Sequence, residues 1–222
     1  MADIINVSSV DGWVEKVQAG GVWGTVRTGA GTTVNSIAST LSLICQLFSG
    51  TFNNRRSFLQ FNTGVVLSND ATIDAVDLVL VLLSKNTFHD ITSEAIISSS
   101  SQVSETALFL FDYSQVVVNT PPEWGGRLPL DVFPSVKLCP LNKTGIDGMR
   151  RKNELSTGLV PAEGWVLMSL RGDRDVDNVS PGFIDINCNM GSFESTFFIP
   201  TLAITWHKAN IQEGVVEDGT IE

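Results

Sequence analysis

The sequence is short of positive charge. It has 14 Lys and Arg residues against 24 Asp and Glu residues in a chain of 222, so its formal net charge is -10 at pH 7. Proteins that bind nucleic acid need a basic surface to face the phosphates. The composition therefore argues against nucleic-acid binding, and for the same reason against docking on an anionic membrane.

Cysteine and histidine are also scarce. Cys45, Cys139 and Cys188 are widely spaced without a CxxC pair, and there are only two histidines. An odd and scattered set of cysteines predicts neither a disulfide framework nor a zinc site, so we expect buried free thiols. The sequence contains no GxSxG, HExxH or Cys–His signature. We therefore predict a protein that is not an enzyme and that has no cofactor, apart from a calcium ion considered below.

Long hydrophobic runs are missing too. The longest apolar stretch, LVLVLL at residues 78–83, is far too short to cross a membrane. The first residues, MADIINVSSVDGW, show no basic segment followed by an apolar core of signal-peptide length. We therefore expect a chain made in the cytoplasm, with neither a signal peptide nor a transmembrane segment.

What the sequence does contain is a series of short apolar or alternating segments separated by turn residues. This pattern is typical of an all-β protein, and it predicts a jelly-roll-like antiparallel β-sandwich of about ten strands with at most one short helix, at 142–154. The predicted strands are 21–27, 41–48, 57–62, 76–84, 94–100, 106–113, 135–142, 164–171, 183–190 and 200–207. We predict one domain over residues 1–206. The acidic segment 207–222 is predicted to be an exposed arm or to pack on a neighbouring subunit.

Three segments carry a more specific pattern. RRSFLQFNTGVVLSNDATIDAVDLVLVLL, residues 55–83, resembles the "R-S-hydrophobic-L-x-F-(D/N)-T" strand and the following "A-x-I-x-x-A-x-L-x-L" strand of DNRLRE-type, carbohydrate-binding-module-like β-sandwich domains. SLRGDRDVDNVSP, residues 169–181, resembles the "L-R-(S/G)-D-x-D-x-x-N-x-x-P" segment of that family. FIPTLAITW, residues 198–206, resembles its closing strand, with Trp206 in place of the usual tyrosine.

The resemblance also implies a function. Together with the VDGWV segment at residues 10–14 and the lack of a signal peptide, the chain looks most like such domains in tailed-bacteriophage virion proteins. It is therefore expected to be a non-enzymatic structural protein of the virion, either a head decoration or a tail or fibre component. Its partners would be other virion proteins and further copies of itself. Two alternatives stay open: a module that binds host-surface glycans, and a polysaccharide hydrolase.

The same resemblance gives structural roles to six residues. In this fold the strand at 57–62 lies deep in a sheet, so Leu59 and Phe61 are expected to face the core, and Leu78 and Leu80 are expected to do so from the next strand. Arg55 or Arg56, at the entry of the first strand, is expected to pair with a carboxylate from another loop. The candidates for that carboxylate are Asp173, Asp175 and Asp177.

The loop GDRDVDN is the best candidate metal site. Asp173, Asp175, Asp177 and Asn178 offer oxygen ligands at closely spaced positions, as loops that bind calcium do. The EF-hand pattern is incomplete, because no glycine follows the third acidic residue and no glutamate comes before Glu194. The alternative is a loop whose carboxylates pair with nearby arginines or cap the backbone.

The loop TPPEWGGRLP, residues 120–129, is the best candidate ligand site. An exposed Trp124 could stack on a sugar ring while Arg127 contacts its hydroxyls. The alternative is a tryptophan that folds back over the core.

Overall fold

The computed structural model describes residues 2–7, 10–63, 71–85, 93–102, 104, 107–115, 123–131, 134–154, 165–195 and 198–208. Strands dominate this part of the chain. They are β1 (Ala2–Asn6), β2 (Gly12–Ala19), β3 (Thr33–Asn35), β4 (Thr40–Phe48), β5 (Thr51–Asn62), β6 (Ala71–Lys85), β7 (Glu94–Ser99), β8 (Leu128–Pro129), β9 (Ser135–Pro140), β10 (Trp165–Gly172), β11 (Ile186–Gly191) and β12 (Thr201–Lys208). The helices are α1 (Trp23–Val26), α2 (Lys143–Glu154), α3 (Asp173–Val176) and the 3-10 helix η1 (Leu110–Gln115).

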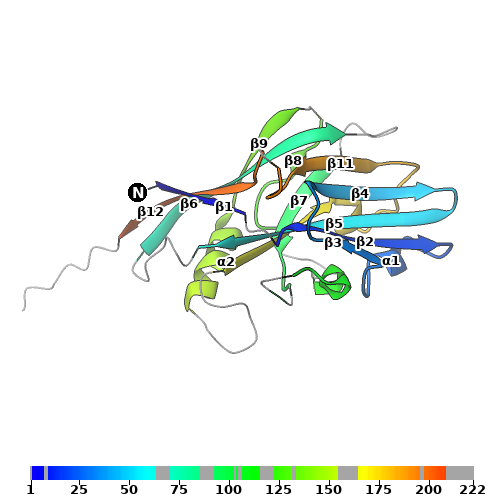
Figure 1. Cartoon of the computed structure of the whole chain (residues 1–222), viewed down its shortest axis with the longest axis horizontal. Helices are drawn as coiled ribbons and strands as arrows, with labels where there is room; N and C mark the ends of the chain where they lie inside the picture. Colours follow the sequence, from blue (N-terminus) through cyan, green and yellow to red (C-terminus); the bar gives the residue numbers. More distant parts are fainter. Residues whose placement is uncertain are drawn as a thin grey trace, which may run out of the picture.

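Two long strands, β5 and β6, organise the sheet because each changes its partner along its length. β2 covers one edge of β5, while β4 and then β10 share the other edge. In the same way β9 covers one edge of β6, while β12 and β11 share the other. This exchange of partners allows a 12-stranded antiparallel sheet to fold over itself into a sandwich that is close to a barrel (Figure 1). The predicted fold class is confirmed.

Both ends of the described chain enter this sheet. β1 pairs antiparallel with β12, with Ala2 opposite Thr205 and Asn6 opposite Thr201. Figure 1 shows these two strands beside β6 at one end of the molecule, while the β4–β5 hairpin extends toward the other. The sheet therefore joins segments that are about 200 residues apart in sequence.

A serine side chain supplies hydrogen bonds at the point along β5 where the neighbouring strand changes from β4 to β10. The last backbone pair between β4 and β5 joins Ile44 to Arg55. Two residues further on, the Ser57 hydroxyl accepts a hydrogen bond from the Ser42 amide at 2.9 Å and donates one to the Ser42 carbonyl at 2.8 Å. Both serines are buried, so this side chain replaces the backbone partner that Ser42 lacks there.

The main core lies between the two layers. Alternate residues of β6, Leu78, Leu80 and Leu82, are at most 1% exposed and pack in one cluster with Leu59 and Phe61 of β5. The four core positions predicted from the sequence, Leu59, Phe61, Leu78 and Leu80, are thus confirmed. Burial of each such side chain contributes roughly 1.5–3 kcal/mol to the free energy of folding.

A smaller apolar cluster covers the other face of β5. It combines Phe58 with Val14 of β2 and with Val10 just before that strand, and with Leu108 and Tyr113 from the segment that contains η1. β5 is therefore buried on both faces, and its polar residues must find partners inside the protein.

Two predicted strands are wrong. Residues 21–27 contain helix α1, because Gly20 and Gly21 have φ angles of +65° and +93° and end β2, and the Val22 carbonyl then accepts the Thr25 amide. Within 106–113, η1 begins at Leu110, and the Asp112 carboxylate accepts the Phe109 amide at 2.7 Å. Local side-chain hydrogen bonds of this kind compete with strand pairing.

Four strands, β1, β2, β3 and β8, were not predicted. α2 confirms the predicted helix at 142–154, and α1 and α3 add two four-residue helices that were not expected. β12 continues to Lys208, so the predicted boundary of the C-terminal arm at residue 207 is too early. Residues 209–222 of that arm lie outside the described residues. Among the described helices, none has the length and apolar character needed to cross a membrane.

Candidate functional site: a buried cluster of ion pairs

The most concentrated set of charged groups in the described chain is centred on Arg56, in the middle of β5. Its side chain is 0% exposed. The guanidinium lies over the ring of Tyr113, with 4.0 Å between Cζ and the ring centroid, and its Nη2 donates a hydrogen bond of 2.9 Å to the Arg27 carbonyl. A planar, delocalised cation can stack and donate hydrogen bonds at once, which makes arginine more suitable than lysine at such a position.

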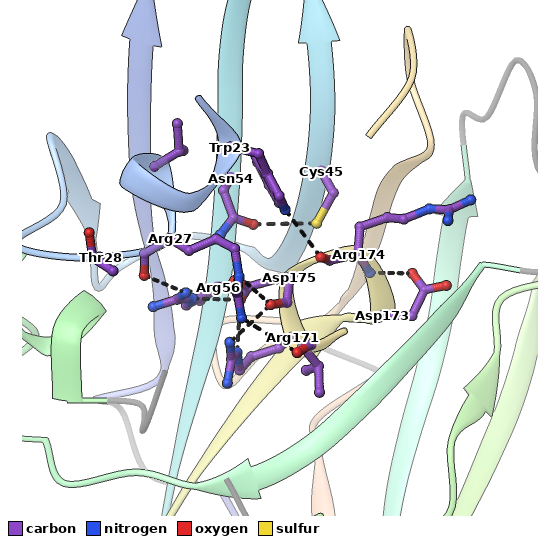
Figure 2. Close-up of polar contacts among 12 residues, drawn as sticks. Trp23, Arg27, Thr28, Cys45, Asn54, Arg56, Arg171, Asp173, Arg174 and Asp175 are labelled. Atoms are coloured by element: carbon purple, nitrogen blue, oxygen red, sulfur yellow. Dashed lines mark hydrogen bonds and ion pairs between the residues drawn. The ribbon is translucent and has the colours of Figure 1, made fainter. Parts of the chain in front are cut away.

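The counter-charge is Asp175, in helix α3. Arg56 Nε and Nη2 donate to Asp175 Oδ2 and Oδ1, both at 2.7 Å, which is a bidentate ion pair. Because α3 starts directly after β10, Asp175 lies only four residues after Arg171, whose Nε donates to Oδ2 at 2.8 Å. Figure 2 shows these side chains converging on the Asp175 carboxylate. The expected pairing of a strand-entry arginine with this loop is therefore confirmed for Arg56 and Asp175.

A third arginine approaches from the turn after α1. Arg27 Nε lies 3.4 Å from Asp175 Oδ1 and also donates to the Asp175 carbonyl. Its Nη2 lies 3.4 Å from the Val176 carbonyl. The cluster thus connects four separate elements: the end of α1, β5, β10 and α3.

The electrostatics of the cluster are dominated by Asp175. Burial on its own would raise the pKa of this carboxyl, but the charges of Arg171 and Arg56 and their hydrogen bonds hold its pKa well below the ordinary value of 3.8. A carboxyl whose pKa is lowered by folding adds stability above its ordinary pKa, and that stability is lost as the pH falls below it. The ion pairs should therefore be fully formed at neutral pH and weaken only in acid.

A shell of neutral polar groups supports the ion pairs. The Tyr113 hydroxyl donates to the Val26 carbonyl at 2.8 Å and accepts from Asn54 Nδ2 at 2.7 Å. Asn54 Oδ1 in turn lies 3.3 Å from Cys45 Sγ. Burial raises the pKa of both the Tyr113 hydroxyl and the Cys45 thiol, so both stay protonated and can donate these hydrogen bonds.

This arrangement is suited to holding elements together rather than to catalysis. Asp175 and Arg56 are fully buried and bonded to each other, so neither is placed to contact a substrate. Removing one partner of a buried charge pair is strongly destabilising. We therefore infer that the cluster has a structural role and holds α1 and α3 against the sheet.

Arg55, the other member of the predicted pair, faces a different partner. Its Nη2 donates to Glu15 Oε1 of β2 at 2.9 Å, its Nη1 donates to the Ser42 hydroxyl at 3.1 Å, and its guanidinium lies 3.8 Å from the ring centroid of Trp13. The two neighbouring arginines thus point to opposite sides of β5, as strand geometry requires.

The four predicted calcium ligands are not brought together around one point. Asp175 is in the cluster, whereas Asp177 receives both Nη atoms of Arg127, at 2.7 and 2.8 Å. Asp173 accepts the Arg174 amide, and Asn178 is exposed with a φ of 56°. Among the residues described, no group of three or more His, Cys, Asp or Glu is placed to hold a metal ion. The geometry matches the alternative reading, a loop whose carboxylates pair with arginines.

The predicted glycan contact needs a correction. Trp124 is only 3% exposed and belongs to the main core. Its ring packs over α2 at Gly148, where an added Cβ would lie 2.7 Å from a ring carbon. Gly148 makes room for the indole and Gly145 for the Trp124 backbone and Cβ, so the ring folds inward and is not available to stack on a sugar. Arg127 remains at the surface, bonded to Asp177 and Glu123.

Sequence reasoning missed Arg27 and Tyr113. Arg27 fell at the end of a predicted strand, and Tyr113 at the end of another. One signal was available for Tyr113, because it is the chain's single tyrosine and follows an acidic residue in a segment rich in phenylalanine. Nothing local in the sequence connects either residue to Asp175.

No protein-family model matches the chain, and no curated protein sequence matches it. The resemblance to DNRLRE-type domains therefore remains an interpretation of the motifs, and the function must be argued from the structure.

Proposed function

We propose that this chain is a non-enzymatic structural protein that works by protein–protein assembly, as a component of a bacteriophage virion. The observation that carries the assembly role is an apolar strip on the outer face of β6 and β9. The virion setting comes from the motif resemblance described above.

The strip follows from the register of the two strands. Leu78, Leu80 and Leu82 of β6 face the core, so Val79 and Val81 between them face outward, where they are only partly buried. On β9, Leu138 lies opposite Val79 and Val136 lies opposite Val81, and each of these two β9 residues is 64% exposed. We call these four residues, Val79, Val81, Val136 and Leu138, the β6–β9 strip.

Such a strip is unusual for a strand pair that faces water, where polar residues normally alternate with apolar ones. Among the described strands, β9 pairs only with β6, so it also lies at an edge of the sheet. Exposed apolar edge strands are sites of association unless they are protected.

We propose that a second copy of the same chain covers the strip, because an uncharged patch is where two acidic copies can meet with the least repulsion. Each copy carries a formal net charge of -10, so two copies repel each other over most of their surfaces. The four side chains of the β6–β9 strip are all uncharged. A patch that meets itself across a two-fold axis needs only to be self-complementary, which a flat row of valine and leucine side chains satisfies.

The test is a pair of charged substitutions in the strip. We expect Val136→Lys combined with Leu138→Lys to abolish self-association while changing the free energy of unfolding by less than about 1 kcal/mol, because both side chains are mainly exposed. Sedimentation velocity over a range of concentrations would measure association, and urea unfolding would measure stability. The chain should also be present in stoichiometric amount in purified particles.

Val22→Lys is the matched control, because Val22 is also 64% exposed but lies at the start of α1, outside the strip. It should associate like the wild type. A wild-type chain that stays monomeric at high concentration would contradict the self-assembly role, and its absence from purified particles would contradict the virion role.

A further inference from the structure

Asp11, a buried carboxyl just before β2, belongs neither to the ion-pair cluster nor to the β6–β9 strip. Asp11 is 0% exposed and precedes Gly12, the first residue of β2. Its Oδ2 accepts the Phe193 amide at 2.9 Å. Its Oδ1 is buried without a hydrogen-bond donor, although the carboxyl of the next residue, Glu194, lies within hydrogen-bonding reach of Asp11. Two ionised carboxylates are both acceptors, so they can bond only through a shared proton.

Asp11 sits where three segments meet. The segment 35–38 packs on one side, because a Cβ at Gly12 would lie 2.2 Å from the Asn35 carbonyl oxygen. On the other side is the 192–195 turn, closed by a bond from the Ser195 amide to the Ser192 carbonyl. The Ser192 hydroxyl joins these two segments by donating to the Ala38 carbonyl at 2.8 Å. The Asp11 carboxyl adds a direct bond from β2 to the turn.

The charged groups around Asp11 are few. The segments packed against it read NSIA at 35–38 and GSFES at 191–195, so Glu194 is the charged residue that they contribute. On β2 itself the nearest ionisable residue is Glu15, which is bonded to Arg55. The segments 35–38 and 191–195 bring no cation to neutralise the pair, and Lys16 of β2 donates to the Thr28 carbonyl.

We propose that the buried Asp11 carboxyl keeps its proton below neutral pH and donates it toward the Glu194 carboxylate, and that this contact holds the 192–195 turn to the start of β2. When the proton is lost, two adjacent carboxylates repel each other, and the exposed Glu194 can move into water while Asp11 stays buried. The contact between the turn and β2 is thus pH-sensitive, and it weakens as the solution becomes alkaline.

The direction of the effect on stability follows from the protonation states. Burial, with the Glu194 charge adding to it, raises the pKa of Asp11 from 3.8 to about 7. The stability that this proton brings is fully present below the unfolded value and is lost as the pH rises through the folded value. One proton held only in the folded state changes the unfolding equilibrium constant by up to about tenfold per pH unit between these limits.

Asp11→Asn in the full chain is the decisive variant, because asparagine keeps an acceptor for the Phe193 amide and offers a permanent donor to Glu194. We expect this variant to lose the fall in stability that the wild type shows between pH 5 and 7, and to be more stable than the wild type at pH 8. Glu194→Gln should reduce this fall without removing it, because Asp11 is still present and burial still raises its pKa. The control is Asp147→Asn, which removes one partly exposed carboxylate, paired with the exposed Lys143 on α2, and should keep the wild-type pH dependence.

Carboxyl-selective carbon-13 NMR gives a readout that a merely structural role would not change. Asp11 should titrate near pH 7 in the wild type and should titrate lower in Glu194→Gln. Titration of Asp11 below pH 5, or an unchanged pH dependence in Asp11→Asn, would overturn the proposal. A rise in melting temperature on adding calcium, present in the wild type and lost in both variants, would also overturn it and would assign the pair to a metal ion.

Discussion

Asp175→Ala is expected to destabilise the folded chain by about 3–5 kcal/mol or more, which is enough to unfold a domain of ordinary stability. The substitution removes the one carboxylate that Arg56, Arg171 and Arg27 all contact, and these arginines are between 0% and 6% exposed at the side chain. Arginine does not lose its proton in proteins, so the positive charges would remain buried and repel each other. Urea unfolding followed by circular dichroism would measure the loss.

Asp177→Ala is the matched control for this experiment. Asp177 is two residues further along and also forms an ion pair with an arginine, but its side chain is 41% exposed and that of Arg127 is 33% exposed. Exposed pairs of this kind are screened by water, so the loss should stay within about 1 kcal/mol. If Asp175→Ala were as stable as Asp177→Ala, the cluster would not hold α1 and α3 against the sheet as we infer.

The pairing of Arg56 with Asp175 was partly predictable from the sequence. The resemblance placed Arg55 and Arg56 at the entry of a deep strand, where one of them was expected to pair with a carboxylate, and the structure places Arg56 within β5 itself. The loop at 173–178 was the acidic candidate with closely spaced carboxylates, and the structure places its second member on Arg56. The choice of Asp175 among three aspartates depends on the four-residue helix α3, which the sequence did not indicate.

Trp124 shows why other features could not be predicted. A tryptophan between prolines and glycines can be an exposed loop residue or one that folds inward, and the local sequence does not decide between the two. The outcome depends on two glycines of α2, about 20 residues later: Gly148 leaves space for the indole, and Gly145 leaves space for the Trp124 backbone and Cβ. The same two glycines had only weakened the helix prediction. Asp11 is a similar case, because its partner Glu194 lies 183 residues away and no local pattern joins them.

Residues of β6 that face the core are needed for folding, and we propose that those that face outward are needed for assembly. Substitutions at neighbouring positions on β6 therefore test the two roles separately. Leu80→Asp is expected to prevent folding. Leu80 is 1% exposed in the main core, so the variant loses the burial of a leucine and places an unpaired carboxylate among apolar groups. The first effect costs about 2–5 kcal/mol and the second costs several more, which together match or exceed the stability of a typical domain.

Val81→Asp, one residue away, should give the opposite result. Val81 belongs to the β6–β9 strip and is partly exposed, so its carboxylate can reach water and the variant should fold with a native circular dichroism spectrum. Its self-association should nevertheless be lost, because a two-fold contact would place two new negative charges close together. If Val81→Asp unfolded like Leu80→Asp, the outer face of β6 would be covered within the chain itself, and the strip could not be the surface on which copies meet.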